Sequence, residues 1–535
     1  MKAENPILRG FHPDPSIIRV GEDYYVANST FEWWPGVRLH HSRDLVHWEM
    51  IEYPLNRVSQ LDLKGVGASQ GIWAPCLTYD KGIFYLVYTV VKSFYCNMYD
   101  TANYLVTAEN IHGPWSEPTA LNNFGFDPSL FHDDDGKKYM VSMVTDHRIP
   151  KKYKGRIILQ EYDAKAKNMY GPVRDIYTGD RIYLEGPHIV KRDGWYYLFC
   201  ADTGTGEAHG QSILRAKNIW GPYEWNENNS ILTTRDTPDF PLQKAGHCDL
   251  VETPEGEWYA VHLCGRPLEN RNAKDAPRFS GERRYPLGRE TAIQKMEWTS
   301  DGWLRLANGT KLPDEKIEVT GLEPYVFGEK TCRDDFKEET LDLEYQSLRI
   351  PMDERFLSLK ERPGYLRMYG REGLSSKFDQ SLIARRWTEF QFEADTKLEF
   401  EPNVFKQMAG LICMYDTDNY FYLHVTCDED LGKCISILKA ENKTYTYPVG
   451  FVPIKEGKPV YLKVSVDHDK LQFYYGLGEE VYEQIGPVFD ASILSDEACL
   501  EGWFTGAMVG ICCQDLTGSG AYADFDWFTY QEKGE

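Results

Sequence analysis

The first half of the chain repeats one short phrase five times, and each copy leads through a turn into an aromatic-rich strand pattern. The copies begin at Asp14, Ala74, Asp127, Glu185 and His247. These starts are 60, 53, 58 and 62 residues apart. Regular spacing of this size is typical of a β-propeller, in which each repeat forms one blade. We therefore expect a five-bladed β-propeller.

Turn residues inside the repeats indicate that the blades are made of hairpins. Examples are Asp80-Lys81-Gly82, Asp133-Asp134-Asp135-Gly136 and Arg192-Asp193-Gly194. Glycine and aspartate tolerate the positive φ angles of tight hairpin turns. Alternating strand patterns continue along the chain, whereas helical periodicity is nearly absent. The sequence thus predicts an all-β protein.

The repeats end near residue 310, and the character of the chain then changes. Residues 311–330 contain Pro313, Gly321 and Pro324 and are expected to form a linker. From residue 331 onward the strand patterns are longer, as in Val460-Tyr461-Leu462-Lys463-Val464. We predict a propeller over residues 1–310 and a β-sandwich over residues 331–535, of the jelly-roll-like, concanavalin-like kind.

The charge of the chain argues against two classes of partner. It has 82 acidic and 59 basic residues, a formal net charge of −23. Binding to nucleic acid or to an anionic membrane needs clustered lysine and arginine, so we expect neither partner. No apolar run approaches the ~18 residues of a membrane span. The first six residues also lack an apolar signal core.

These features predict a cytoplasmic protein. The 12 cysteines are scattered along the chain and do not have the spacing of a zinc site. We expect mostly reduced, buried thiols that behave as small apolar side chains. Disulfide bonds are the alternative that the sequence leaves open.

Three of the five phrases open on an acidic residue: Asp14, Asp127 and Glu185. Because equivalent positions in a radial array lie equally far from its axis, these carboxyls are expected to meet near one point. In the alternative interpretation, each acid only caps the entry to a strand. Carboxyls that share a site cannot all ionise easily, and glycoside hydrolysis uses two carboxyls in different protonation states.

The chemistry suggests one role for each acid. Glu185 has the longest reach and suits proton delivery to a leaving oxygen. Asp14 is stiffened by Pro13 and Pro15 and suits a general base. Asp127 would then tune the pKa of the acid. The residues alone also allow these three roles to be exchanged.

Motifs in both halves of the chain carry a family resemblance. They are Asn5-Pro6-Ile7-Leu8, Gly10-Phe11-His12-Pro13-Asp14-Pro15-Ser16, Gly71-Ile72-Trp73-Ala74-Pro75, Asp127-Pro128-Ser129-Leu130-Phe131, Glu185-Gly186-Pro187-His188, Leu287-Gly288-Arg289-Glu290-Thr291, Ser381-Leu382-Ile383-Ala384-Arg385-Arg386 and Phe504-Thr505-Gly506-Ala507. Together they resemble glycoside hydrolase family 43, in particular its β-xylosidase branch. The resemblance implies an inverting enzyme with Asp14 as general base, Glu185 as general acid and Asp127 as pKa modulator.

The resemblance also implies which residues bind substrate. Arg289 would face the non-reducing sugar, and Trp73 and Phe31 would form walls for the sugar ring. Phe504 would come from the sandwich and close the pocket, so that only a chain end can enter. In the alternative interpretation, Arg289 lies on the surface at a strand end and the three aromatic residues belong to an ordinary core.

His247 opens the fifth repeat, where the other repeats carry an acid or alanine. It is a candidate for hydrogen bonding to substrate on the propeller axis. We expect no metal site and no required cofactor, and a Ca²⁺ held through water near His247 is the alternative. The Asp133–Gly136 turn resembles a calcium loop, but it lacks the later glutamate and fits a hairpin better.

The sequence therefore predicts an inverting, exo-acting glycoside hydrolase that releases xylose from the non-reducing ends of 1,4-β-xylo-oligosaccharides. An α-L-arabinofuranosidase, or an enzyme with both activities, is the nearest alternative because the two sugars present a similar pentose face. A non-catalytic carbohydrate-binding propeller is an alternative of another class. An interaction propeller of the WD type is disfavoured, since its repeats are ~40–45 residues long. The family resemblance also implies a homo-oligomer, either a tetramer or a dimer.

Overall fold

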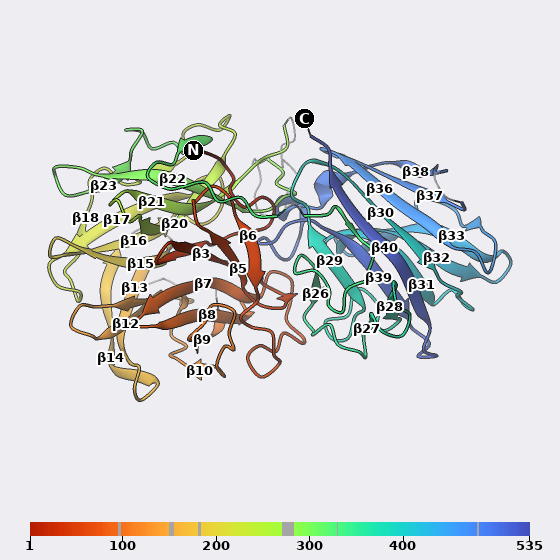
Figure 1. The fold of residues 1–535 in the computed structure, drawn as a ribbon, viewed down its shortest axis with the longest axis horizontal. Helices are drawn as coiled ribbons and strands as arrows, with labels where there is room; N and C mark the ends of the chain where they lie inside the picture. The colour runs from red at the N-terminus through yellow and green to blue at the C-terminus, as the bar shows by residue number, and fades with distance from the viewer. Residues whose placement is uncertain are drawn as a thin grey trace.

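The computed structural model describes residues 1–94, 98–148, 155–179, 183–269, 283–328, 330–478 and 481–534. In these ranges the only helical elements are two short 3-10 turns, η2 (Ala491–Ile493) and η3 (Asp496–Ala498). No helix there has the length and apolar character needed to span a bilayer. Figure 1 shows a propeller and a two-sheet sandwich lying side by side. The prediction of an all-β fold is confirmed.

Five antiparallel sheets form the propeller, and each is made of strands that are nearly consecutive in sequence. The first blade contains β2 (Ser16–Val20), β3 (Asp23–Asn28), β5 (Arg38–Ser42) and β6 (Glu49–Glu52); the second contains β7 (Gly71–Asp80), β8 (Ile83–Ser93), β9 (Asp100–Ala108) and β10 (Thr119–Ala120); the third contains β11 (Phe126–His132), β12 (Lys138–Met143), β13 (Gly155–Asp163) and β14 (Asn168–Gly179); the fourth contains β15 (Leu184–Arg192), β16 (Trp195–Asp202), β17 (Gly210–Ala216), β18 (Glu224–Trp225) and β19 (Leu232–Thr233); the fifth contains β20 (Gln243–Glu252), β21 (Trp258–Gly265), β22 (Glu290–Trp298) and β23 (Leu304–Leu306). The five predicted repeats thus correspond to five blades.

The sandwich consists of two larger sheets. The eight-stranded sheet contains β27 (Leu357–Ser358), β28 (Leu366–Tyr369), β40 (Tyr522–Glu532), β30 (Gln391–Glu399), β36 (Val460–Asp467), β37 (Lys470–Gly476), β38 (Glu483–Asp490) and β25 (Arg333–Asp334); the nine-stranded sheet contains β34 (Thr444–Thr446), β33 (Gly432–Glu441), β32 (Asn419–Asp428), β31 (Gln407–Asp416), β39 (Met508–Asp515), β29 (Leu382–Arg386), β26 (Gln346–Leu348), β4 (Trp33–Trp34) and β35 (Val452–Pro453). The two sheets enclose the largest apolar core among the described residues.

Strand β30 shows how sequence pattern produces this core. Its residues alternate between half-buried and buried along the whole strand. Phe392, Ala394 and Leu398 are the apolar members on the buried face. Successive side chains of a strand point to opposite faces, so this alternation places one face in the core and the other toward water. The strand patterns that predicted the sandwich therefore mark its inner face.

Short strands join the two parts of the molecule. Strand β4 leaves the first blade and pairs with β26, so that the nine-stranded sheet includes two residues of the propeller segment. Near the N-terminus, β1 (Lys2–Glu4) pairs with β24 (Lys316–Glu318), and Leu8 bridges Thr291. Part of the segment from 311 to 330 is thus a strand that ties the two ends of the propeller together.

The inner strands begin with a shared backbone irregularity. The φ angles are +52° at Asp14, +32° at Ala74, +50° at Asp127, +54° at Gly186 and +57° at His247. In the last four of these blades, the pairing between the first and second strands shifts register at this residue. Positive φ is unfavourable for residues with a Cβ, so its recurrence marks an imposed geometry.

This recurrence corrects one detail of the sequence alignment. The position equivalent to Asp14 and Asp127 is Gly186, and Glu185 lies one residue earlier. A Cβ at Gly186 would lie 2.8 Å from ring atoms of His247. The fourth repeat therefore has glycine at the crowded position and supplies its acid from the neighbouring residue.

A buried ion pair links the fifth blade to the sandwich. Lys244 Nζ lies 2.7 Å from Glu497 Oε1, and their side chains are only 2% and 0% exposed. The other carboxylate oxygen, Glu497 Oε2, accepts a hydrogen bond from the backbone N–H of Tyr285 at 3.0 Å. Lys64 and Asp379 form a second pair between the two parts, at 2.8 Å, but they are 42% and 41% exposed.

We expect Lys244→Met to destabilise the protein by about 3–5 kcal/mol, because it leaves the Glu497 carboxylate buried without its cation. The matched control is Lys64→Met, which should cost less than about 1 kcal/mol because solvent screens that pair. Urea unfolding followed by tryptophan fluorescence measures both changes. Equal shifts in the two variants would contradict the assigned importance of burial.

Candidate active site

All eight residues that the sequence analysis selected lie around one cavity, which the inner strands of the propeller surround. Its lining consists of Asp14, Phe31, Trp73, Phe126, Asp127, Glu185, Thr205, His209, His247, Leu263, Arg289 and Phe504. Every blade contributes, and Phe504 comes from the sandwich segment between η3 and β39. The three carboxyls selected from the repeats therefore share one cavity.

Four lining residues were missed by the sequence analysis: Phe126, Thr205, His209 and Leu263. Phe126 directly precedes Asp127 in the repeat phrase, and this position could have suggested it. Thr205 and His209 lie in the loop between β16 and β17, outside any repeated pattern. Leu263 belongs to an ordinary apolar strand, so its sequence gives no functional signal.

The Asp14 carboxylate is fixed by contacts to both of its oxygens. Ser29 Oγ donates to Oδ2 at 2.7 Å, and Arg289 Nη1 donates to Oδ1 at 2.9 Å. The Asp14 residue is 6% exposed. A hydrogen bond between two charged groups is strong and directional, so this acid has one defined orientation toward the cavity.

Asp127 and Glu185 form an acidic pair in which Asp127 is buried and Glu185 is half-buried. Asp127 Oδ2 accepts a hydrogen bond from the backbone N–H of Gly186 at 3.0 Å, which joins the third and fourth blades. Burial, together with the charges of Glu185 and Asp14, raises the pKa of Asp127 well above its usual range. Burial and the charge of Asp14 raise the pKa of Glu185 to about 7. The cavity can therefore hold protonated and ionised carboxyls together near neutral pH.

Arg289 connects the acidic cluster with the sandwich. Besides its bond to Asp14, Nη1 donates to Thr205 Oγ1 at 3.2 Å, and Nη2 donates to the carbonyl oxygen of Phe504 at 3.0 Å. Its guanidinium carbon lies 5.7 Å from the Phe31 ring centre and 5.3 Å from that of Phe504. The Arg289 guanidinium thus helps to orient the Asp14 carboxylate and contacts the rings of Phe31 and Phe504.

Two buried nitrogen atoms beside the cavity are available for a ligand. Among the described residues, neither Arg289 Nε nor His209 Nε2 has a hydrogen-bond partner. The other ring nitrogen of His209, Nδ1, lies 2.8 Å from the carbonyl oxygen of Lys244, which fixes the ring. Buried polar atoms are normally paired, so these two indicate where a polar ligand can complete the network.

Aromatic rings form the apolar wall of the cavity. The rings of Phe31 and Phe504 stack at 5.9 Å, and Trp73 meets Phe504 edge-on at 5.1 Å. Phe126 packs against Trp73 at 5.5 Å. The backbone N–H of Phe504 donates to Ser69 Oγ at 3.1 Å, so the sandwich residue is held against the propeller.

His247 lies on the acidic side of the cavity. Its Nδ1 is 3.8 Å from Asp14 Oδ1. Burial lowers the pKa of His247 to about 3, which makes the ring neutral at physiological pH. Within the described part of the chain, no group of three or more His, Cys, Asp or Glu residues could hold a metal ion.

Comparison with known proteins identifies the family. The profile of Glycosyl hydrolases family 43 matches residues 3–304, and that of the Beta xylosidase C-terminal Concanavalin A-like domain matches residues 333–531. The chain belongs to glycoside hydrolase family 43. This confirms the resemblance found in the sequence motifs.

Individual relatives match over their full length. A Bacillus subtilis protein named beta-xylosidase is 45% identical, with 100% of both chains covered. Xylosidase/arabinosidase 43B of Humicola insolens is 47% identical, covering 99% of this chain and 98% of its own. The crystal structure of a xylan beta-1,4-xylosidase from Bacillus halodurans C-125 superposes with a TM-score of 0.95 at 48% identity, covering 99% of this chain and 100% of that one.

The carboxyl of Glu185 is expected to titrate near pH 7. Difference infrared spectra between the wild type and Glu185→Gln, collected across pH 5–9, isolate its carboxyl band. In an Asp14→Asn background the pKa of Glu185 should fall, because the Asp14 charge that raises it is gone. A titration near the ordinary glutamate value of about 4.3 in the wild type would contradict the assigned environment.

Proposed function

We propose that this protein is an inverting, exo-acting glycoside hydrolase that releases xylose from the non-reducing ends of 1,4-β-xylo-oligosaccharides. The main support is the convergence of Asp14, Asp127 and Glu185 on one cavity, with pKa values raised at the latter two. Membership of family 43 supports the reaction class. The names of the relatives from Bacillus subtilis and Bacillus halodurans support xylose as the sugar.

In the proposed reaction, two carboxyls act on opposite sides of one bond. Asp14 takes a proton from water, and the water oxygen attacks the anomeric carbon. Glu185 gives its proton to the glycosidic oxygen as the bond to that carbon breaks. The sugar passes through an oxocarbenium-like state and leaves with inverted configuration. Solvent then restores the proton of Glu185 and removes that of Asp14.

Asp127 is proposed to act through Glu185. Its bond to the backbone N–H of Gly186 fixes the residue that follows the acid. Because its own pKa is raised well above the usual range, it can remain protonated while Glu185 cycles. The bond to Gly186 supports a positioning role for Asp127, and the family resemblance supports the role of pKa modulator.

The aromatic wall is proposed to bind a single terminal sugar. Phe31 and Trp73 offer apolar faces to a xylose ring, and Phe504 closes the cavity from the sandwich. Arg289 Nε and His209 Nε2 lie where sugar hydroxyls can accept or donate hydrogen bonds. A neutral His247 can add another such bond. This arrangement favours release of one residue from a chain end.

An enzyme with both xylosidase and α-L-arabinofuranosidase activity is the second candidate. The name of the Humicola insolens relative, xylosidase/arabinosidase 43B, favours it. A propeller that binds carbohydrate without cleaving it has less support, because binding alone gives no reason to bring three carboxyls together in one cavity.

We further propose that the protein works in the cytoplasm as a homo-oligomer, a tetramer or a dimer, and needs no cofactor. Support for the compartment comes from the cysteines of the described ranges, all of which are free thiols. Light scattering coupled to size exclusion measures the oligomeric state. A Ca²⁺ near His247 remains the alternative, and activity after treatment with a chelator tests it.

Replacing either principal carboxyl should separate the two proposed roles. Asp14→Ala is expected to lower kcat by about 10³-fold or more on every xyloside, because no base activates water. Glu185→Ala should lose a similar factor on xylobiose but retain far more activity on 2,4-dinitrophenyl β-xyloside, whose leaving group needs no proton. The exposed carboxyl variant Glu22→Ala serves as control.

Proton NMR of the wild-type reaction completes this test, since an inverting enzyme forms α-xylose first. Near-normal turnover by Asp14→Ala, or β-xylose as the first product, would contradict the proposed mechanism.

The sugar preference is expected to favour xylose. We predict a higher kcat/KM for p-nitrophenyl β-D-xyloside than for p-nitrophenyl α-L-arabinofuranoside, with measurable activity on both. Phe504→Ala should raise KM for both pentosides more than it lowers kcat, because the Phe504 ring contacts the sugar without taking part in proton transfer. A preference for the arabinoside would reverse the order of the two candidates.

A further inference from the structure

One buried carboxyl has no task in the proposed mechanism, although it follows a wall residue of the cavity in the sequence. Glu32 is 1% exposed and is not among the residues that line the described cavity. It stands between Phe31, which lines the cavity, and β4, which pairs with β26 of the sandwich. Burying a carboxyl is costly unless it has partners, so its contacts indicate what it does.

The Glu32 carboxyl binds the loop that precedes β7. Its Oε2 accepts a hydrogen bond from the backbone N–H of Ser69 at 2.9 Å. Ser69 is fully buried and has a φ angle of +56°, which is unfavourable for a residue with a Cβ. A buried N–H that loses its acceptor is costly, so the contact with Glu32 helps to hold Ser69 in this conformation.

Ser69 in turn holds two residues of the aromatic wall. Its carbonyl oxygen accepts a hydrogen bond from Trp73 Nε1 at 2.8 Å, and its Oγ accepts one from the backbone N–H of Phe504 at 3.1 Å. The N–H, the carbonyl and the hydroxyl of Ser69 therefore bind three different residues. Through this one serine, Glu32 is connected to a ring of the propeller and to a ring of the sandwich.

Close packing on both sides of Ser69 leaves little room for adjustment. A Cβ at Gly502 would lie 3.0 Å from both Ala68 Cβ and Ser69 Oγ. A Cβ at Gly71 would lie 2.3 Å from the carbonyl oxygen of Phe31. Tightly packed interiors transmit displacements, so a movement of Ser69 changes the positions of the residues that it binds.

The position of Glu32 is itself fixed from the sandwich. Its carbonyl oxygen accepts a hydrogen bond from the backbone N–H of Arg349 at 2.9 Å, and Arg349 Nε donates to the carbonyl oxygen of Val66. Burial raises the pKa of Glu32 to about 7; the charge of Asp416 adds to this rise, and the charge of Arg349 opposes it. The carboxyl has an oxygen that can accept from Ser69 in either protonation state.

We propose that Glu32 is a positioning residue for sugar binding, which acts through Ser69 to place the rings of Trp73 and Phe504. Glu32 does not touch the sugar. This inference rests on the proposed function, because it takes these rings as the wall that binds the terminal sugar. Loss of the contact with Ser69 should therefore weaken sugar binding and leave the proton-transfer groups in place.

Three substitutions separate the reach of the side chain from its charge. Glu32→Met removes the acceptor at similar length, Glu32→Asp keeps the carboxyl but withdraws it, and Glu32→Gln keeps an oxygen within reach of the Ser69 N–H. Met and Asp should raise KM for p-nitrophenyl β-D-xyloside about tenfold or more and change kcat less than about threefold. Gln should keep KM within about threefold of the wild type, because its amide oxygen can accept the same hydrogen bond.

The matched control is Glu344→Ala. Glu344 Oε2 accepts a hydrogen bond from Arg38 Nη2 at 2.7 Å, so it also joins the sandwich to the propeller. Neither residue is among those that line the described cavity. This variant should lower the thermal midpoint and leave KM unchanged. A rise in KM equal to that of Glu32→Met would show a general effect of loosened contact between the two parts, and would overturn the specific role of Glu32.

A measurement without substrate follows the wall directly. In protein labelled with 5-fluorotryptophan, the fluorine resonance of Trp73 is assigned by its loss in Trp73→Phe. It should move in Glu32→Met and Glu32→Asp and stay in place in Glu32→Gln and Glu344→Ala. Combining Glu32→Met with Phe504→Ala should raise KM by less than the product of the two single effects, because both act on the same ring.

An unchanged KM or an unmoved Trp73 resonance in Glu32→Met would overturn the proposal, and Glu32→Asp decides the matter if the Met variant does not fold. Equal effects of Gln and Met would also overturn it, since charge rather than the hydrogen bond would then matter. If the wild type cleaves xylosides but the resonance does not move, only the role of Glu32 fails. If the resonance moves but the wild type cleaves no xyloside, the proposed function fails and the placement of the wall by Glu32 stands.

Discussion

The hydrogen bonds of Arg289 are the contacts on which the active site depends. This guanidinium joins Asp14 of the first blade, Thr205 of the fourth blade and Phe504 of the sandwich. It is also the only arginine or lysine among the residues that line the described cavity, where three carboxyls meet. One cation cannot compensate three carboxylates in one cavity, so part of the negative charge is removed by retained protons. Placing these groups in one cavity therefore favours a protonated carboxyl, which the proposed hydrolysis requires.

The backbone of the propeller fixes the positions at which these carboxyls meet. Positive φ angles recur where the inner strands begin, and the two aspartates of the cluster lie at such positions. Adjacent blades are then cross-linked at the same level: Ser16 Oγ and the backbone N–H of Ile17 both donate to Asp249 of the fifth blade. Strain at single residues is tolerated because neighbouring blades fix the geometry on both sides.

The sequence predicted the fold and the acidic cluster through two different signals. The spacing of the repeats and their turn residues were sufficient to predict five blades, since each blade is a set of hairpins formed by residues close in sequence. The alignment of the repeats was wrong at one position. Because acidic residues were matched with one another, Glu185 was aligned with Asp14 and Asp127, whereas the backbone geometry aligns Gly186 with them. The crowded approach of His247, which no linear pattern records, favours glycine at that position in addition to its positive φ.

Other features could not be derived from local patterns. Thr205 and His209 lie in a loop, and their placement depends on how the fourth and fifth blades pack. Phe504 was selected through family resemblance, because nothing in its own segment shows that the sandwich reaches the propeller axis. The two-residue strand β4, which carries the first blade into the nine-stranded sheet, is too short to give a period. These are long-range contacts, and their sequence signal is spread over segments hundreds of residues apart.

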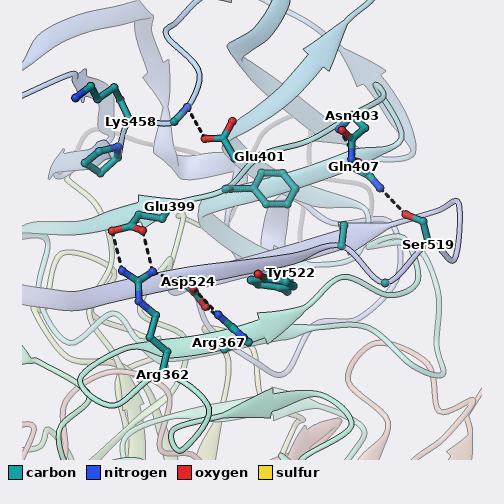
Figure 2. Close-up of a pocket in the computed structure, with 15 residues that line it drawn as sticks. Arg362, Arg367, Glu399, Glu401, Asn403, Gln407, Lys458, Ser519, Tyr522 and Asp524 are labelled. Atoms are coloured by element: carbon teal, nitrogen blue, oxygen red, sulfur yellow. Dashed lines mark hydrogen bonds and ion pairs between the residues drawn. The ribbon is translucent and has the colours of Figure 1, made fainter.

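Two clusters of charged residues in the molecule use charge in opposite ways. In the catalytic cavity, carboxyls outnumber cations, burial raises pKa values, and protons become available for transfer. In the cluster of the sandwich that Figure 2 shows, Arg362 and Arg367 are each matched by a carboxylate, Arg362 by Glu399 and Arg367 by Asp524, both at 2.8 Å. An unbalanced buried cluster stores reactive protons, whereas a balanced and partly exposed one only presents fixed hydrogen-bonding geometry. The same residue types thus support, as we propose, bond cleavage at one place and a fixed local structure at the other.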